Sequence, residues 1–483
     1  MEEDDWITAA TSEGIPRCPS IPQLPVEVCG RIIDHVATGV DHKYVSLTSD
    51  PHLSTLASCA LVCQDWYYLT WYHLRQRIHL RRREDVLSLF KTLRERPRLR
   101  EAVQQVIISG ALPGYRQPIG HMGTFAVMLA GKAPRLSRIT ITDAKWIAGA
   151  VRMVDVGYLS RFSSINTLNI INVTLSSVSL LSRLVSALPR LRELSCINVD
   201  CLQKQQVFPG SLPLNCANME YLGVRWVAPE LEDFLVQISR ASRVRVLILA
   251  VVGESGPPES AASRSQTLLD ASSTSADVVG LRFWVDPTPM PDGTIDATVE
   301  RHYNLSHHDR LWRLEIHLYH PYAAWPWIPY ILSRITSKHF QAMSVMLVIR
   351  TDHMADDLGE MLTTMEQDSV LGRLDSILQE EHFSSIVVSR GICLGFDTHD
   401  DTWTSGTLEP GSALRERWDE LARQKMPHSE GRGILTTMHN YQDFIVWRED
   451  MERIHRAQAT QPNTGGEAQR EGQDIESPRG GTD

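Results

Sequence analysis

Cysteine and histidine are the side chains whose spacing in this sequence comes nearest to a chemical site. Cys59 and Cys63 stand four residues apart, which places both thiols on one face of a helix. Two further groups lie close together in the sequence, one of cysteines and one of histidines: Cys196, Cys201 and Cys216, and His302, His307, His308, His317 and His320. A structural zinc site needs four ligands that converge. Because most of these cysteines occupy positions of an apolar pattern, we expect core packing, with no metal and no cofactor.

The short motifs that mark phosphate-binding loops and activated nucleophiles are absent. The sequence contains no Gly-x-x-x-x-Gly-Lys-Ser/Thr, Gly-x-Ser-x-Gly, His-Glu-x-x-His or Gly-x-Gly-x-x-Gly. We therefore predict no catalytic residue, and a binding protein is favoured over a free-standing enzyme.

Size and charge narrow the class of protein further. The chain of 483 residues is longer than a domain with a single hydrophobic core usually is. Its content of 42% hydrophobic and 22% charged residues is typical of a soluble globular chain. The net charge of −10 gives no general attraction to nucleic acid or to an anionic membrane. The longest apolar run, Val246 to Val252, is far shorter than a spanning helix. We expect a cytoplasmic and/or nuclear protein, with neither nucleic acid nor membrane as a partner.

The elements that could position a binding site begin with a helical segment near the N-terminus. Val28, Ile32, Ile33 and Val36 recur on one face of a helix that Pro25 is suited to start. A second apolar stripe follows after residue 52. A module of this size is marginal by itself, so its surplus apolar positions indicate a partner surface. The alternative is a helical cap on a larger domain.

The same residues resemble the F-box motif. They are Leu24-Pro25-Val26-Glu27-Val28 with Ile32, followed by Leu61-Val62-Cys63-Gln64-Asp65-Trp66. The resemblance implies a three-helix module that binds the Skp-type adaptor and, through it, the cullin of an SCF-type ubiquitin ligase. By position it assigns the adaptor contact to Leu24, Pro25, Ile32, Val62 and Trp66. Residues 38–52 form a longer insertion than is usual for the family.

A repeat follows. Five segments, starting at Leu136, Ile165, Leu191, Met219 and Val244, carry apolar residues at positions 1, 4 and 6. Their spacing of about 25–29 residues is that of leucine-rich repeats, and helical stripes lie between several of them. The pattern resembles a degenerate leucine-rich-repeat array. It departs from the family at position nine, where valine replaces asparagine, which predicts the loss of the asparagine ladder.

Such an array predicts an α/β solenoid with a parallel sheet on its concave side. Side chains between the apolar anchors then point outward, and we expect the client-binding residues among them: Glu193, Tyr221, Arg225, Trp226, Arg245 and Trp312. Tyrosine, tryptophan and arginine are enriched at binding hot spots. The alternatives are a solvated strand face and a non-repetitive α/β domain.

The predicted organisation has five parts. They are a disordered tail at 1–19, the F-box at 20–75, a linker helix at 76–100, the solenoid at 101–454 with loops at 253–277 and 286–309, and a disordered tail at 455–483. The arginine-rich linker could alternatively be a nuclear-import or nucleic-acid patch. The favoured function is a non-catalytic substrate-recognition adaptor of an SCF-type ligase. The alternative is an interaction scaffold outside any ligase.

Overall fold

The structure is a computed structural model. It describes residues 24–38, 51–146, 153–203, 212–213, 215–252, 260–284, 292–319, 324–349, 354–386, 391–398, 412–439 and 441–460. The predicted tail at 1–19, residues 461–483 of the predicted tail at 455–483, and most of the insertion at 38–52 lie outside the described residues.

Three helices form the N-terminal module: α1 (Val26–Thr38), α2 (Pro51–Cys59) and α3 (Gln64–Leu74). The Pro25 carbonyl accepts the first hydrogen bonds of α1, from the backbone N–H groups of Val28 and Cys29. The module has a core of its own. Ile33, Leu53 and Leu56 are its buried members, and Trp66 packs against them.

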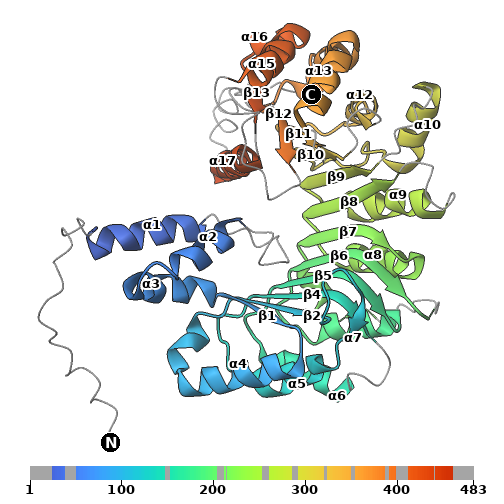
Figure 1. Cartoon of the computed structure of the whole chain (residues 1–483). Helices are drawn as coiled ribbons and strands as arrows, with labels where there is room; N and C mark the ends of the chain where they lie inside the picture. Colours follow the sequence, from blue (N-terminus) through green and yellow to red (C-terminus); the bar gives the residue numbers. More distant parts are fainter. Residues whose placement is uncertain are drawn as a thin grey trace, which may run out of the picture.

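Every strand pairing of the sheet is parallel, and neighbouring strands follow one another along the chain (Figure 1). The strands are β1 (Arg77–Leu80), β2 (Gln105–Ser109), β3 (Gln117–Pro118), β4 (Arg138–Lys145), β5 (Thr167–Leu175), β6 (Glu193–Cys201), β7 (Tyr221–Val227), β8 (Val246–Val252), β9 (Val278–Trp284), β10 (Arg313–Leu318), β11 (Ala342–Ile349), β12 (Ile392–Thr398) and β13 (Leu435–Met438). Only β3 stands off this path, where it pairs with β4.

Most of the helices that connect the strands lie along one face of the sheet (Figure 1). They are α4 (Arg83–Glu95), α5 (His121–Leu129), α6 (Met153–Gly157), α7 (Val178–Ser186), α8 (Pro229–Ala241), α9 (Ser260–Ser272), α10 (Asp292–His302), α12 (Trp327–Leu332), α13 (Met354–Gln367), α14 (Val370–Ile377), α15 (Ala413–Lys425) and α16 (Pro427–Gly431), with short 3-10 turns at 97–101, 158–161, 216–218 and 381–383. Strand and helix therefore alternate through the repeats.

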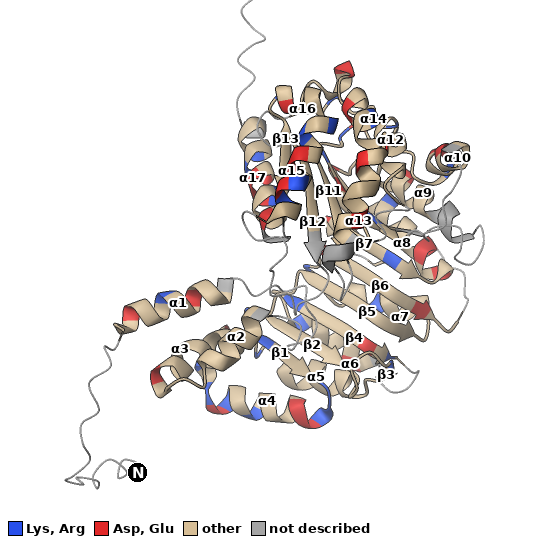
Figure 2. Cartoon of the chain, turned by 45° about the horizontal axis from the view of Figure 1, so that its top comes forward, with Lys and Arg blue, Asp and Glu red and all other residues tan. Residues whose placement is uncertain are grey.

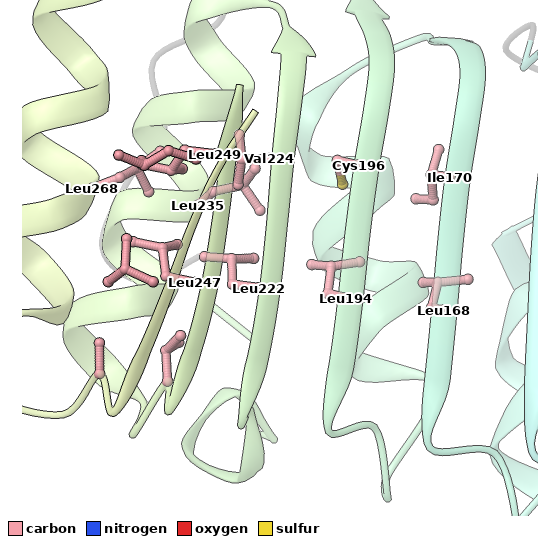
Figure 3. Packing of buried hydrophobic residues seen from close by; sticks show 14 of the residues in the cluster. Leu168, Ile170, Leu194, Cys196, Leu222, Val224, Leu235, Leu247, Leu249 and Leu268 are labelled. Carbon is pink, nitrogen blue, oxygen red and sulfur yellow. The ribbon is translucent and has the colours of Figure 1, made fainter. Parts of the chain in front are cut away.

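The apolar anchors of the repeat stack into rows in the core. Leu168, Leu194, Leu222 and Leu247 form one row, and the residues two positions later form the next (Figure 3). Leu235 of α8 and Leu268 of α9 close this core from the helical side. Each fully buried leucine contributes roughly 1.5–3 kcal/mol through removal of apolar area from water. The predicted strand positions 1, 4 and 6 are thus the core.

Both predicted internal loops contain a helix, so the prediction was wrong over 260–272 and 292–302. In α9, Leu268 and Leu269 are buried, and in α10 the same holds for Ile295 and Val299. Serine and alanine make up seven of the 13 residues of α9, and α10 has only Ile295 and Val299 as large apolar residues, so little remains to reveal a helical period. Packing on the neighbouring repeats supplies the stability that intrinsic propensity lacks.

Two predicted boundaries also need correction. The supposed linker helix at 76–100 contains strand β1, which pairs with β2, so the sheet begins at Arg77 and not at 101. The supposed tail from 455 begins inside helix α17 (Tyr441–Thr460). This helix lies across the face of the sheet that the other helices leave free, where Phe444, Trp447 and Met451 pack against strand residues.

A side-chain ladder runs across the strands one position before the valines at position nine. Asp143, Asn172, Asn198 and Trp226 occupy equivalent positions and have φ between 50° and 53°. Asparagine and aspartate tolerate this left-handed region far better than most residues. Asn172 donates to the Asp143 carboxylate at 2.7 Å, and Asn198 donates to Asn172 Oδ1 at 3.1 Å. The predicted loss of the ladder was therefore wrong: the ladder is shifted to position eight.

Arg116 closes this ladder. Its guanidinium donates to Asn172 Oδ1 at 2.9 Å, to Asn198 Oδ1 at 2.9 Å and to the Asn198 carbonyl at 3.0 Å, and it pairs with Asp200. Thr174 Oγ1 accepts a further bond at 3.0 Å. One arginine side chain thus joins the loop before α5 to strands β5 and β6.

We expect the stability of the chain to fall as the pH drops from 6.5 toward 4. Burial lowers the pKa of His308 to about 4, so the folded protein keeps this imidazole neutral in a range where the unfolded chain protonates it. The unfolded state then binds more protons, which removes about 2 kcal/mol of unfolding free energy by pH 5. Urea titrations at pH 7 and pH 5 measure this. The His308→Leu variant should lack the contribution, and the exposed neighbour His307→Leu should retain it.

Candidate protein-binding surfaces

The N-terminal module exposes an apolar surface. Of the 18 large hydrophobic side chains that are exposed in the described part of the chain, nine belong to this module. They are Leu24, Val26, Val28, Ile32, Leu61, Val62, Tyr67, Tyr68 and Tyr72. A soluble protein rarely gathers so many exposed apolar groups without a partner to cover them.

Four of the five residues predicted to contact an adaptor are exposed. The exposed fraction is 57% for Leu24 and 65% for Val62, and Pro25 and Ile32 are exposed as well. Trp66 differs from them. It is half-buried and packs on the core of the module, so its removal also disturbs the fold that presents the other four.

The module is joined to the sheet without a separate linker. Strand β1 starts three residues after α3 ends. Trp71 of α3 packs against the main core, and its ring lies 5.7 Å from the guanidinium carbons of both Arg75 and Arg96. His73 Nε2 lies 2.9 Å from Asp34 Oδ1 and ties α3 to α1.

A second candidate surface lies on the helix-free face of the sheet, between the module and α17; we call it the open face (Figure 1). Glu193 of β6 and Tyr221 of β7 are paired neighbours on it and are half-buried. A Cβ at Gly223 would approach the Tyr221 ring to 3.3 Å, so glycine lets this ring lie down on the sheet. Burial raises the pKa of the Tyr221 hydroxyl.

Trp226 is the strained member of the open face. It occupies the ladder position that holds asparagine in the two preceding repeats, with φ 51°, and 40% of it is exposed. Its ring meets Trp284 edge-on at 4.9 Å, and Trp284 stacks on Tyr319 at 3.7 Å. A bulky residue in this backbone region costs on the order of 1–3 kcal/mol, and such strain concentrates at functional sites.

Two arginines lie beside the aromatic group. Burial and the nearby Arg282 charge lower the pKa of Arg225, which also hydrogen-bonds to Tyr319. Arg282 is 15% exposed, its Nη2 lies 3.9 Å from Glu315, and its Nη1 has no hydrogen-bond partner among the described residues. Two guanidinium groups beside one carboxylate give this part of the open face an excess of positive charge, which attracts an anionic group.

Trp312 and Arg245 do not belong to the open face, and their predicted place was wrong. Trp312 is 4% exposed because α17 covers it, with the His455 ring stacked on it at 4.2 Å. Arg245 lies at the edge where strands begin, and its Nε donates to Asp277 at 2.7 Å. The burial of Trp312 could not be anticipated, since the covering by α17 is a long-range contact.

The expected absence of a bound metal and of a cofactor stays a prediction. Among the residues that the structure describes, His, Cys, Asp and Glu form no group suited to hold a metal ion. Cys196 is buried in the core, where burial raises its pKa to about 12, and Cys393 packs under α17. In the same described part of the chain, no helix combines the length and apolar character needed to cross a membrane.

The stacked strand–helix units, their rows of buried anchors and the ladder decide the fold class. The fold is a leucine-rich-repeat-like solenoid. No protein-family model matches the chain, and no curated protein matches it. Among solved structures, the TLR13–ssRNA13 complex resembles the solenoid at 13% identity with a TM-score of 0.28, over 76% of this chain and 47% of the other. The chain thus spans about half the length of that structure.

A leucine-rich-repeat protein of Leptospira interrogans, LIC12759, resembles the solenoid at 9% identity with a TM-score of 0.15. That likeness covers 55% of this chain and 89% of the other.

Proposed function

We propose that the chain is the substrate-recognition adaptor of an SCF-type ubiquitin ligase. The exposed apolar surface of the N-terminal module carries this proposal, because the residues that resemble the F-box motif fold into three helices whose matching side chains, apart from Trp66, face solvent. The module binds the Skp-type adaptor and, through it, the cullin. The chain itself performs no bond chemistry, and it acts by raising the effective concentration of a client near the ligase.

The open face supports the second half of the proposal. Tyr221, Arg225, Trp226 and Glu193 lie together there, and aromatic residues with arginine are the usual anchors of protein interfaces. The strain at Trp226 indicates a residue retained for binding and not for folding. We place the client on this face, in the cytoplasm and/or the nucleus.

Co-purification from cells distinguishes the adaptor from the alternative, an interaction scaffold outside any ligase. Tagged full-length chain is expected to recover cullin together with the Skp-type adaptor. A Tyr221→Ala/Trp226→Asn variant should still recover both but lose most client proteins, because Asn suits the left-handed backbone and preserves the fold. Recovery of the adaptor without cullin would favour the scaffold, and an unchanged client set would remove the open face from the proposal.

A further inference from the structure

The edge of the sheet where the strands begin carries a regular row of arginines. The strand register aligns the residue that precedes the first buried anchor of each repeat. From β4 to β10 these residues are Arg135, Ser164, Arg190, Asn218, Arg243, Ser275 and Arg310. Arginine thus occupies every second strand. In Figure 3, where the strands point upward, this edge lies at the bottom.

The polar residues between the arginines have a structural role. Ser164 Oγ donates to the Leu136 carbonyl at 2.7 Å, and Ser275 Oγ donates to the Val244 carbonyl at 2.9 Å. Both hydroxyls tie one repeat to the one before it. The arginines at the alternate positions are exposed instead.

The charged residues that directly follow the first anchor of a repeat form ion pairs with one another. Arg192 pairs with Glu220 at 3.3 Å, and Arg245 pairs with Asp277 at 2.7 Å. In the row itself, Arg135 pairs with Glu101 at 3.1 Å and Arg310 pairs with Asp277 at 3.3 Å. By contrast, Arg190 and Arg243 form no ion pair with any residue that the structure describes. The excess positive charge of this edge therefore rests on these two, in a chain whose net charge is −10.

Three of the four arginines of the row line two adjoining clefts, which together we call the edge groove. A cleft of about 600 Å³ contains Arg190, Asn218 and Arg243 together with both partners of the Arg192–Glu220 pair. A neighbouring cleft of about 370 Å³ shares Arg243 and Arg245 with it and extends to Arg310. No aromatic side chain lines either cleft. Stacking of bases, on which single-stranded nucleic acid binding depends, has no platform here.

The distance between successive arginines of the row indicates the conformation of the ligand. Neighbouring strands lie ~4.8 Å apart, so successive arginines of the row are ~9.6 Å apart. A polyproline II chain advances ~3.1 Å per residue, which places every third side chain on one side at ~9.3 Å intervals. Guanidinium groups match carboxylates in a bidentate geometry.

We propose that this edge groove binds an acidic peptide segment of a partner protein in an extended, polyproline II-like conformation, with a carboxylate at every third residue. The site is separate from the surfaces of the proposed function, and its test does not depend on them.

Fluorescence anisotropy with the full-length chain tests the proposal. The probes are a labelled peptide of four Glu-Pro-Pro repeats, a peptide of equal composition with all its glutamates in one block, and an oligouridine of equal length. The spaced peptide should bind roughly fivefold more tightly than the block peptide, since only its carboxylates match the row. The Arg190→Gln/Arg243→Gln variant should lose about tenfold in affinity for it.

A matched control removes two positive charges at a place away from the edge groove. Arg83 and Arg94 are exposed on α4, whose basic residues are blue in Figure 2. The Arg83→Gln/Arg94→Gln variant should bind the spaced peptide within about twofold of the parent chain. Equal affinity for both peptides, an equal loss in the control variant, tighter binding of oligouridine, or no binding would each overturn the proposal.

Discussion

Alanine at Leu24, Pro25 and Val62 together is expected to weaken binding of the Skp-type adaptor at least about a hundredfold, since apolar hot spots each contribute roughly 2–4 kcal/mol. All three residues are exposed, so the variant should remain folded. Titration of purified adaptor by calorimetry measures the loss, and circular dichroism of both proteins checks the fold. Trp66 is left intact because it supports the core of the module.

The solenoid offers a matched control. Leu112 and Leu202 are 56% and 57% exposed, close to the exposure of Leu24. Their double alanine variant should bind the adaptor like the parent chain. Unchanged binding by the folded triple variant would reject the assignment of this surface and leave the module as a helical cap.

The Arg116→Met variant is expected to lose on the order of 3 kcal/mol of unfolding free energy, because hydrogen bonds to a charged group are the strong ones and several would be lost together. Methionine retains much of the aliphatic stem, so the change isolates the guanidinium. Its removal frees acceptors on Asn172, Asn198 and Asp200 at once.

Urea denaturation followed by tryptophan fluorescence measures the effect. Arg161→Met, at an exposed arginine of the same repeats, should change the unfolding free energy by less than about 0.5 kcal/mol. A similar small change for Arg116→Met would show that the ladder holds its geometry without the arginine.

The strands could be predicted well from the sequence, because each buried strand position requires an apolar residue and the resulting pattern is visible in the sequence. The anchors at positions 1, 4 and 6 must be apolar wherever a strand faces the helices, and Leu168, Leu194 and Leu222 obey that rule. The helices α9 and α10 were missed because their own residues carry little helical signal. These helices are stabilised by packing on the neighbouring repeats, and the residues of the helices alone do not reveal that packing.

The candidate sites were predictable to a smaller extent. Tyr221 and Arg225 follow from alternation along a strand once the repeat is recognised, whereas Trp226, with its positive φ at position eight, lies outside that alternation. The burial of Trp312 does not, since it depends on α17, more than a hundred residues away in the sequence. The repeat alignment already places Arg190 and Arg243 directly before the first anchor of their segments, but only the structure shows that the two line one cleft.

The direct passage from α3 into β1, with the Trp71 ring beside two arginines, joins the module to the solenoid through a junction of only two residues. A protein held on the open face is then offered to whatever the module binds at one distance and in one orientation. In the proposed ligase, such a junction would favour those lysines of the client that lie within a narrow shell around the module. A glycine-rich insertion between Leu74 and Arg77 would widen that shell without altering either binding surface.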